Sequence, residues 1–335
     1  MSLPTATDHV WRDREQANAV HDYVDLVRYA TLAASSHNTQ PWRFRLEPGR
    51  ISIFPDFSRR CPKVDPDDHH LYASLGCAAE NLLLAAHAEG LKGHASFDED
   101  SPCVRIDFEK TAPLRSALFD AITKRQCSRT EYDGAPLSGE QLGLLENAGH
   151  GDGVSILFIT ESGRKEKIIE YVEEGNAAQF ADPEWAAEMR KWIRFNARSA
   201  VRTGDGLYGA VLGIPGVPGW LGKLLMNMAA SAESQNRKDA KHIRSSSAIA
   251  VLYSEQDDKR HWIEAGRSFE RLALQAAAMD LRTAFINQPV EVPAIRLRFA
   301  NFLGIGDRRP DLIVRIGRGP EAARSLRRPV EQVLI

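Results

Sequence analysis

The sequence has few cysteines, and no two of them are close together in the chain. The four, Cys61, Cys77, Cys103 and Cys127, form no C-x-x-C motif, so they predict neither a disulfide framework nor a zinc site. Cysteines in this arrangement are typical of a reducing compartment, and we expect a cytoplasmic protein without a metal. Residues 65–70, Asp-Pro-Asp-Asp-His-His, offer the nearest candidate for metal ligands. Side chains so close in sequence point in different directions, so we predict a solvated acidic turn that caps a helix.

An excess of charge of either sign is also absent. The chain has 43 Lys and Arg against 45 Asp and Glu, a net charge of −2, so neither a nucleic acid nor an anionic membrane is an expected partner. No apolar run is long enough to span a membrane, and residues 11–16 are too charged for the core of a signal peptide. The most apolar stretch, Leu207 to Ala230, contains Pro215, Pro218 and Lys223, and we predict a buried or lid-like segment.

A loose internal repeat indicates how the chain is organised. Residues 76–91 and 266–281 match at a constant offset of 190, with Gly76 opposite Gly266 and Glu80 opposite Glu270. Both segments have helical periodicity, and each is followed by a strand. Each is also preceded by a shorter helix that leads through a loop into a strand, first over residues 26–46 and then over 142–160. Amphipathic helices share Leu and Ala by composition alone, so a chance match stays open.

This order of elements predicts an α+β fold with strands grouped in small sheets, in contrast to the regular alternation of a doubly wound fold. We place the first half at residues 1–112 and the second at 113–335. The second half contains a long insertion, about residues 173–244, with helical patterns around Trp185 and Trp192. Insertions of this length usually cover a site or form an interface, and we expect a lid.

One loop in the first half has the composition of a cofactor site. It reads Ser35-Ser36-His37-Asn38-Thr39-Gln40-Pro41-Trp42 and lies between a predicted helix and a predicted strand. The Asn38 and Gln40 amides both donate and accept hydrogen bonds, Pro41 fixes a turn, and Trp42 is a large apolar anchor. An ordinary polar turn before an aromatic residue has the same composition.

Arginines dominate the candidate residues of the second half. Arg125 and Arg129 are four residues apart, so one helical turn would place both guanidinium groups on the same side, where they could bind a phosphate. Cys127 lies between them. Arg327 and Arg328 lie in the C-terminal tail. Taken alone, either pair is more typical of a solvated basic surface.

Together, these segments resemble the Acg-type branch of the FMN-binding nitroreductases. The loop is similar to the S-S-x-N-x-Q-P-W loop of that family, and residues 327–334 are similar to its R-R-P-x-E-x-V-L ending. Residues 125–132 resemble its R-R-S-x-R-x-F segment, with Tyr132 in place of Phe. Residues 80–86 and 287–291, which begin Glu-Asn and Asn-Gln-Pro, complete the likeness. Cys127 replaces the usual serine, and a thiol is the weaker hydrogen-bond donor.

The resemblance implies a nitroreductase-like fold in which the two tandem halves form an intramolecular pseudo-dimer with a lid insertion. It implies one FMN at the seam, bound by Ser35, Ser36, Asn38, Gln40, Arg125, Cys127, Arg129, Asn287, Arg327 and Arg328. Asn38 and Gln40 would contact the ring, and Arg125, Arg129 and Arg328 the phosphate.

The chemistry implied is an FMN-dependent oxidoreductase. NADH or NADPH would reduce the flavin at N5 and leave, and a nitroaromatic or quinone would then take the electrons in a ping-pong sequence. No side chain is expected to be catalytic. The other reading is an FMN storage protein whose lid closes the site and permits little turnover. The partners expected are small molecules, and the chain would be a monomer or a homodimer.

Overall fold

The first part of the chain folds into a four-stranded antiparallel sheet with a long helix against it. The computed structural model describes residues 2–12, 23–212, 216–222 and 231–335. Helices α1 (Leu3–Trp11) and α2 (Tyr23–Thr31) precede the sheet, whose strands have the order β1-β2-β4-β3. The strands are β1 (Trp42–Glu47), β2 (Arg50–Pro55), β3 (Leu91–Asp98) and β4 (Cys103–Lys110). Helix α3 (His69–Ala88) links β2 to β3 and is buried along most of its length, which explains its nearly continuous apolar sequence.

The second part repeats this arrangement. Its sheet has the order β5-β8-β10-β9. The strands are β5 (Val154–Ile159), β8 (Ala248–Ser254), β9 (Arg282–Phe285) and β10 (Arg309–Gly317). Helix α11 (Lys259–Ala278) links β8 to β9 just as α3 links β2 to β3, so the strands correspond one to one in the same spatial order. Helices α4 (Ala117–Ala121) and α5 (Gly139–Gly149) precede this sheet, and α12 (Gln288–Glu291) and α13 (Pro293–Leu303) lie between β9 and β10.

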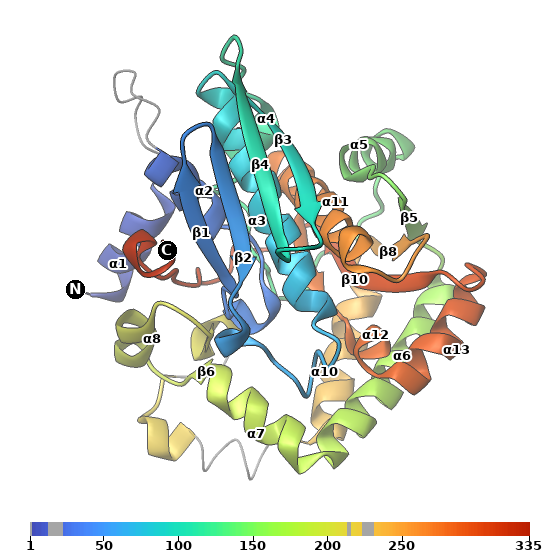
Figure 1. Ribbon diagram of the computed structural model, residues 1–335. Helices are drawn as coiled ribbons and strands as arrows, with labels where there is room; N and C mark the ends of the chain where they lie inside the picture. Colours follow the sequence, from blue (N-terminus) through green and yellow to red (C-terminus); the bar gives the residue numbers. More distant parts are fainter. Residues whose placement is uncertain (1, 13–22, 213–215, 223–230) are drawn as a thin grey trace.

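Helices α3 and α11 pack against each other in the centre of the molecule (Figure 1). They cross at the two glycines that the repeat aligned. A Cβ atom on Gly76 would lie 1.9 Å from the Ile263 carbonyl oxygen, and one on Gly266 would lie 1.8 Å from the Ala73 carbonyl oxygen. Only glycine permits backbones to approach so closely. The α+β prediction is confirmed, while the division into halves at residues 112 and 113 stays a prediction.

The insertion connects β5 to β8, where the first sheet has only the short turn at Pro48 and Gly49 between β1 and β2. It contains α6 (Ser162–Ala181), α7 (Pro183–Trp192), α8 (Ala197–Thr203) and α10 (Ala232–Arg244). Two short strands, β6 (Ile193–Arg194) and β7 (Leu207–Tyr208), pair within it. Helix α6 runs unbroken through residue 173, so the helical insertion begins earlier than expected. In the apolar stretch 207–230, residues 213–215 and 223–230 lie outside the described part of the chain.

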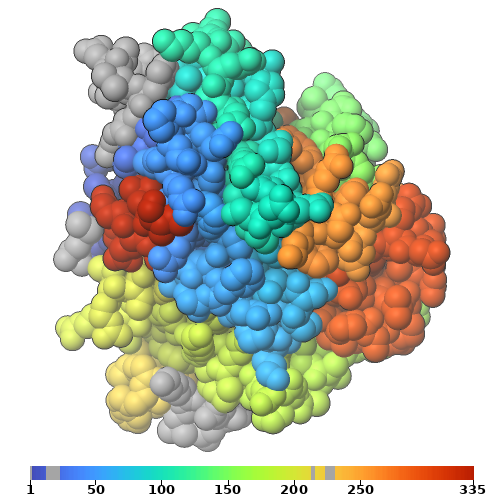
Figure 2. Space-filling view, in the orientation of Figure 1, coloured from blue at the N-terminus to red at the C-terminus, as the bar shows by residue number. Residues whose placement is uncertain are grey.

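The C-terminal residues cross over to the first sheet. The Phe44 amide donates to the Val333 carbonyl oxygen at 2.7 Å, and the Ile335 amide to that of Phe44 at 2.9 Å, so the tail extends the sheet along β1. Figure 2 shows these residues packed against the N-terminal part of the chain, with the insertion beneath it. Within the described residues, no helix combines the length and apolarity needed to cross a membrane.

Candidate functional site

A cavity of about 840 Å³ lies between the two sheets and the insertion. The first half contributes the loop residues Ser35, Ser36 and His37 and one side of α3. The second half contributes Arg129, Arg315 and the segment 284–288, and the insertion contributes side chains from α6, α7 and α10. A volume of this size is in the range of pockets for cofactors and other small molecules.

The loop at the cavity edge has an unusual backbone. His37, Asn38 and Gln40 have positive φ values of 48°, 53° and 53°. Non-glycine residues rarely adopt this region, and they persist there only when the surrounding structure holds them. Within the loop, the Ser35 hydroxyl accepts a hydrogen bond from the backbone amide of Gln40 at 3.1 Å. Burial lowers the pKa of His37 to about 4, helped by the charge of Arg129, so this ring is neutral.

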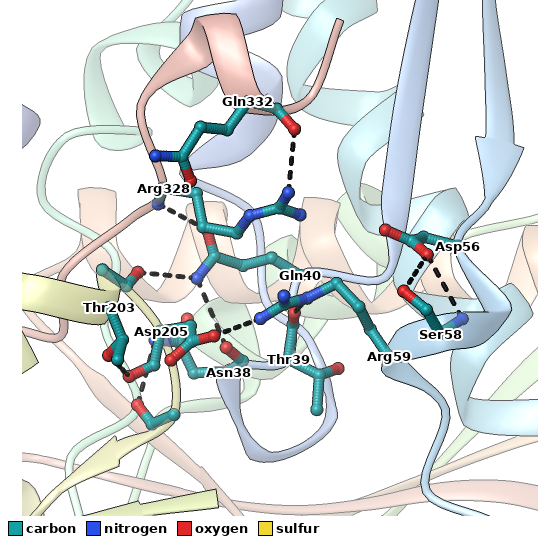
Figure 3. A network of polar contacts seen from close by, with 12 residues as sticks. Asn38, Thr39, Gln40, Asp56, Ser58, Arg59, Thr203, Asp205, Arg328 and Gln332 are labelled. Atoms are coloured by element: carbon teal, nitrogen blue, oxygen red, sulfur yellow. Dashed lines mark hydrogen bonds and ion pairs between the residues drawn. The ribbon is translucent and has the colours of Figure 1, made fainter. Parts of the chain in front are cut away.

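The Asn38 and Gln40 side chains hold the loop in place (Figure 3). Asn38 Nδ2 donates to the carbonyl oxygens of Gly206 and Leu326, at 3.0 and 3.1 Å. Gln40 Nε2 donates to the Gly204 carbonyl at 2.9 Å, and its Oε1 accepts from the Arg328 amide at 2.8 Å. Both amides thus bind the insertion and the C-terminal tail, and neither side chain lines the cavity. Their predicted contact with a flavin ring stays a prediction.

An ion-pair network continues from this loop into the insertion (Figure 3). Asp205, between β7 and α8, accepts from Arg194 Nη2 at 2.6 Å and also pairs with Arg59 of the first half. Arg59 in turn donates to the Thr39 carbonyl. Although burial acts to raise the pKa of Asp205, the hydrogen bond and charge of Arg194 and the hydrogen bond of Arg59 hold it below its ordinary value. The network therefore fixes the segment around residue 205 to the first half.

Arg125 and Arg327 lie behind the loop, outside the cavity lining. Arg125 Nε is 2.9 Å from the carboxylate of the fully buried Glu270, and its Nη2 donates to the Leu32 carbonyl at 2.8 Å. Arg327 donates to the carbonyls of Thr31, Leu32 and Ala33. Carbonyls at the end of a helix lack partners within it, and α2 ends here, so the two arginines cap it. Burial, with the charge of Arg125, lowers the pKa of Arg327 to about 9.

The prediction that Arg125 and Arg129 share a helical turn is wrong. Helix α4 ends at Ala121, and after a turn at 122–124 the backbone is extended, with Cys127 bridged to Thr283 at the edge of the second sheet. An extended backbone sends the two side chains to different places: Arg125 to the buried Glu270 and Arg129 to the cavity. The structure thus separates the two groups that the spacing had joined.

Among the remaining predicted residues, too, some line the cavity and others do not. Asn287 lines the cavity, and its Oδ1 accepts from the Ile313 amide at 2.9 Å. Arg328 donates through Nη2 to the Gln332 carbonyl at 2.8 Å and does not line the cavity, nor does Cys127. Of the ten predicted residues, the cavity lining contains Ser35, Ser36, Arg129 and Asn287. Whether any of them binds FMN stays a prediction.

The sequence analysis did not single out Lys238 and His242 of α10 or Arg315 of β10, which are among the basic residues of the cavity lining. Arg315 is 1% exposed, and its guanidinium carbon lies 4.1 Å from the ring centre of Tyr132. The signal for Arg315 was present, because it is a charge in the middle of an otherwise apolar strand, Leu312 to Ile316. Lys238 and His242 carry no such signal, since α10 is a strongly polar helix.

The turn at residues 65–70 caps a helix, as expected, but the prediction that it is solvated and that its side chains diverge is wrong. Asp65, His69 and His70 are buried, with ligand atoms within 4.8 Å of one another. The Asp65 carboxylate accepts the amides of His70 and Leu71 at 2.9 Å, and His69 Nε2 is 2.7 Å from Asp311. Burial raises the pKa of Asp65 to about 7 and that of Asp311 to about 8. These bonds use most of the groups that a metal would need.

No family model matches the chain. It is 27% identical over 329 residues to the Mycobacterium tuberculosis protein "Putative NAD(P)H nitroreductase Rv3131", across 91% of this chain and 88% of that protein. It is 23% identical over 321 residues to "Putative NAD(P)H nitroreductase acg" of the same organism, across 92% and 93% of the two chains. The chain is thus similar along nine-tenths of its length to Acg-type NAD(P)H nitroreductases, which confirms the resemblance predicted from its motifs.

Among solved structures, the FMN-dependent nitroreductase NfnB from Mycobacterium smegmatis in complex with NADPH matches with a TM-score of 0.43 and 12% identity. The match covers 64% of this chain and 96% of that one.

Proposed function

We propose that the protein binds FMN in the cavity and is an NAD(P)H-dependent oxidoreductase for small-molecule acceptors. The observation that carries the proposal is the position of the cavity, between the Ser35–Ser36 loop of one half and Arg129 and Asn287 of the other. The names of relatives that match 91% of the chain support it. We further propose that the chain is an intramolecular pseudo-dimer with a single FMN. The loop motif at residues 35–42 lies in the first half and the segment with Arg125 and Arg129 in the second, and each of these motifs occurs once in the sequence.

The residues present fit FMN. When bound, FMN supplies hydride acceptance and donation at its N5 atom. The Ser35 and Ser36 hydroxyls and the Asn287 amide are neutral partners suited to a ring edge or a sugar chain, and Arg129 and Arg315 are suited to a phosphate. Arg315 Nη1 is buried and has no hydrogen-bond partner among the described residues, which an anionic ligand would correct. The role of Asn38 and Gln40 is then to position the loop.

The acceptors we propose are nitroaromatics or quinones. Phe180, Trp185 and Met189 of the insertion give the cavity an apolar wall that suits a planar aromatic ring. Reductant and acceptor would occupy this same space in turn, so we expect parallel lines in double-reciprocal plots of initial rates. Convergent lines would contradict this order.

The first test is the visible spectrum of the purified protein, followed by incubation with excess FMN, desalting, and extraction of the flavin. We expect one FMN per chain. Protein that stays colourless after this treatment would contradict the proposal, and two flavins per chain would contradict the single site.

One observation favours the second function, FMN storage. The insertion forms a wall of the cavity and is fixed to the first half through Asp205 and Gln40. Anaerobic mixing of FMN-loaded protein with NADPH separates the two functions. Rapid loss of the oxidised flavin absorption supports the oxidoreductase, and a loss too slow for turnover supports storage.

A further inference from the structure

Among the described residues, the cavity lining contains two carboxyl side chains, Asp239 and Glu291. Glu291 ends α12, one turn after Asn287, and its backbone amide donates to the Asn287 carbonyl at 3.0 Å. Its side-chain Oε2 accepts a hydrogen bond from Gln179 Nε2 of α6 at 2.6 Å. The residue after Gln179 is Phe180, which belongs to the apolar wall of the cavity. Glu291 therefore lies between a proposed partner of the flavin and the wall proposed for the acceptor.

No lysine or arginine neutralises Glu291 within the described part of the chain, and its hydrogen-bond partner Gln179 is neutral. The titratable groups that act on its charge are His70 of α3 and Asp65 of the preceding turn, and its own charge acts on the buried Cys61 thiol. Burial raises the pKa of Glu291 and Asp65 adds to this, although His70 and Gln179 oppose it. The carboxyl group thus keeps its proton to a higher pH than an exposed glutamate does.

Three other titratable groups of the cavity are less suited to release a proton. Asp239 accepts from three side-chain amides, at 2.9, 2.8 and 3.2 Å, so its oxygen atoms are used as acceptors. Burial lowers the pKa of His37 and of His70, so each imidazole gains its second proton only in more acidic solution than usual. Glu291 has one donor on its side chain and opens to the cavity that it lines.

We propose that Glu291 is a catalytic residue that donates a proton to the bound acceptor. The proposal rests on the proposed function, because the reduction of the acceptor creates the need for the proton. A quinone that receives a hydride from N5 of reduced FMN gains two electrons and one proton, so it needs one further proton to become a hydroquinone. A nitro group that receives a hydride likewise needs one further proton to lose water and become a nitroso group.

In this step the O–H bond of Glu291 breaks as an O–H bond forms on the acceptor, and the carboxylate that remains regains a proton from solvent after the product leaves. The negative charge that develops on the acceptor oxygen is removed as it forms. The hydrogen bond from Gln179 then stabilises the carboxylate, since an amide donor binds a charged oxygen more strongly than a neutral one.

The test reduces FMN-loaded protein in the absence of oxygen and compares its reoxidation by two acceptors. p-Benzoquinone must take up protons, whereas ferricyanide accepts electrons alone, so only the first reaction depends on an acid. Glu291→Gln keeps an acceptor for Gln179 but has no acidic proton. We expect this variant to slow reoxidation by the quinone on the order of 100-fold and to leave the rate with ferricyanide unchanged. Glu291→Asp keeps a carboxyl group and should recover part of the quinone rate.

The matched control is Glu174→Gln, which removes a carboxylate from the same helix as Gln179. Glu174 is exposed and pairs with Arg298 outside the cavity, so its loss should change neither rate. A second measurement does not depend on turnover. The infrared absorption of a protonated carboxyl group should be present in the flavin-free parent protein at the pH of the assay and be reduced in Glu291→Gln.

The outcomes separate this role from the proposed function. If the protein binds FMN and the quinone reoxidises the parent and Glu291→Gln equally fast, Glu291 is not the acid, and the proposed function still holds. Equal slowing with both acceptors would leave Glu291 a structural role alone and overturn the proposal, as would the same infrared absorption in parent and variant. Protein that takes up no FMN would overturn the proposed function and this role together.

Discussion

Gln40 is fully buried, and both ends of its amide are used. Nε2 donates to the carbonyls of Gly204 and Asn38, and Oε1 accepts from the Arg328 amide. Three segments that are far apart in sequence thus meet at one side chain. The same residue has φ = 53°, so its bonds also hold a strained backbone. A residue that resembles a cofactor ligand in sequence therefore has a structural task in the fold.

Replacing Gln40 by alanine should destabilise the protein strongly. The Gly204 carbonyl and the Arg328 backbone amide would stay buried without a hydrogen bond, whereas the Asn38 carbonyl would keep the one from the Gly206 amide. We expect the free energy of unfolding to fall by about 2–4 kcal/mol. Urea unfolding followed by circular dichroism measures this change. Gln332→Ala is the control, because the bond at that position uses the backbone carbonyl, and its effect should stay within about 0.5 kcal/mol. Equal midpoints for the two variants would contradict the positioning role.

His37 should make the protein sensitive to acid. Its pKa is about 4 in the folded protein against an ordinary 6.5, so between these values the unfolded chain binds a proton that the folded protein does not. The stability that depends on neutral His37 is therefore complete above pH 6.5 and is lost as the pH falls toward 4. His69, His70 and His242 also have lowered pKa values, mainly through burial, and act in the same direction.

His37→Asn isolates this contribution, since asparagine has no charge to gain and tolerates a positive φ. Between pH 7 and pH 4.5 we expect the variant to lose about 2 kcal/mol less unfolding free energy than the parent protein. Urea midpoints at both pH values test this expectation. A parallel loss in the two proteins would show that His37 does not titrate as its environment indicates.

At the scale of elements, the segment around Asp205 decides how firmly the insertion is held. Its carboxylate joins Arg194 of the insertion to Arg59 of the first half, and Arg59 also binds the strained loop. Phe180 of α6 and Trp185 and Met189 of α7, in the same insertion, form one apolar wall of the cavity. Loosening this ion pair should therefore open the cavity without altering its lining.

Asp205→Asn should increase hydrogen exchange in residues 193–208 and speed the bleaching of FMN-loaded protein by NADPH several-fold. The cause is the loss of a partly buried carboxylate between two guanidinium groups, worth about 2–4 kcal/mol. Glu233→Gln is the control, because it removes an exposed pair with Arg237 within the insertion. Faster exchange in Asp205→Asn with unchanged bleaching would show that the insertion does not control access.

The helices could be predicted from the sequence more fully than the site could. The helices around Gly76 and Gly266 were recognisable because apolar periodicity survives on a helix that faces a core. The spacing of Arg125 and Arg129 misled because residues four apart are close neighbours only on a helix, and in this extended segment they are separated along the chain. Lys238 and Arg315 could not be joined from sequence, since only the path of the insertion brings α10 to β10.

At the scale of the whole molecule, two units with the same strand order are joined through α3 and α11. The tail then crosses from the second unit to β1 of the first, and Arg327 caps α2. The α3–α11 contact, the tail on β1 and Arg327 on α2 all join the two units where they meet. A ligand in the cavity would therefore contact a surface that neither unit forms alone. The stability of that surface depends on how closely the two central helices approach.

Gly266→Ala tests this dependence. The added methyl group would lie 1.8 Å from the Ala73 carbonyl oxygen, and a backbone atom cannot move aside without shifting α3. We expect the free energy of unfolding to fall by at least about 3 kcal/mol, above the usual range for overpacking because the contact is with main chain. Both sheets should lose structure in the same urea transition, since both depend on the seam.

The matched control is Gly143→Ala, inside α5, where a methyl group meets nothing within 4 Å. There the same substitution should stabilise the protein by about 0.5–1 kcal/mol, because alanine loses less conformational freedom in a helix. Opposite signs for the two variants would assign the cost at Gly266 to the helix contact. If Gly266→Ala unfolded at the same urea concentration as the parent protein, the two central helices could not be as close as the structure places them.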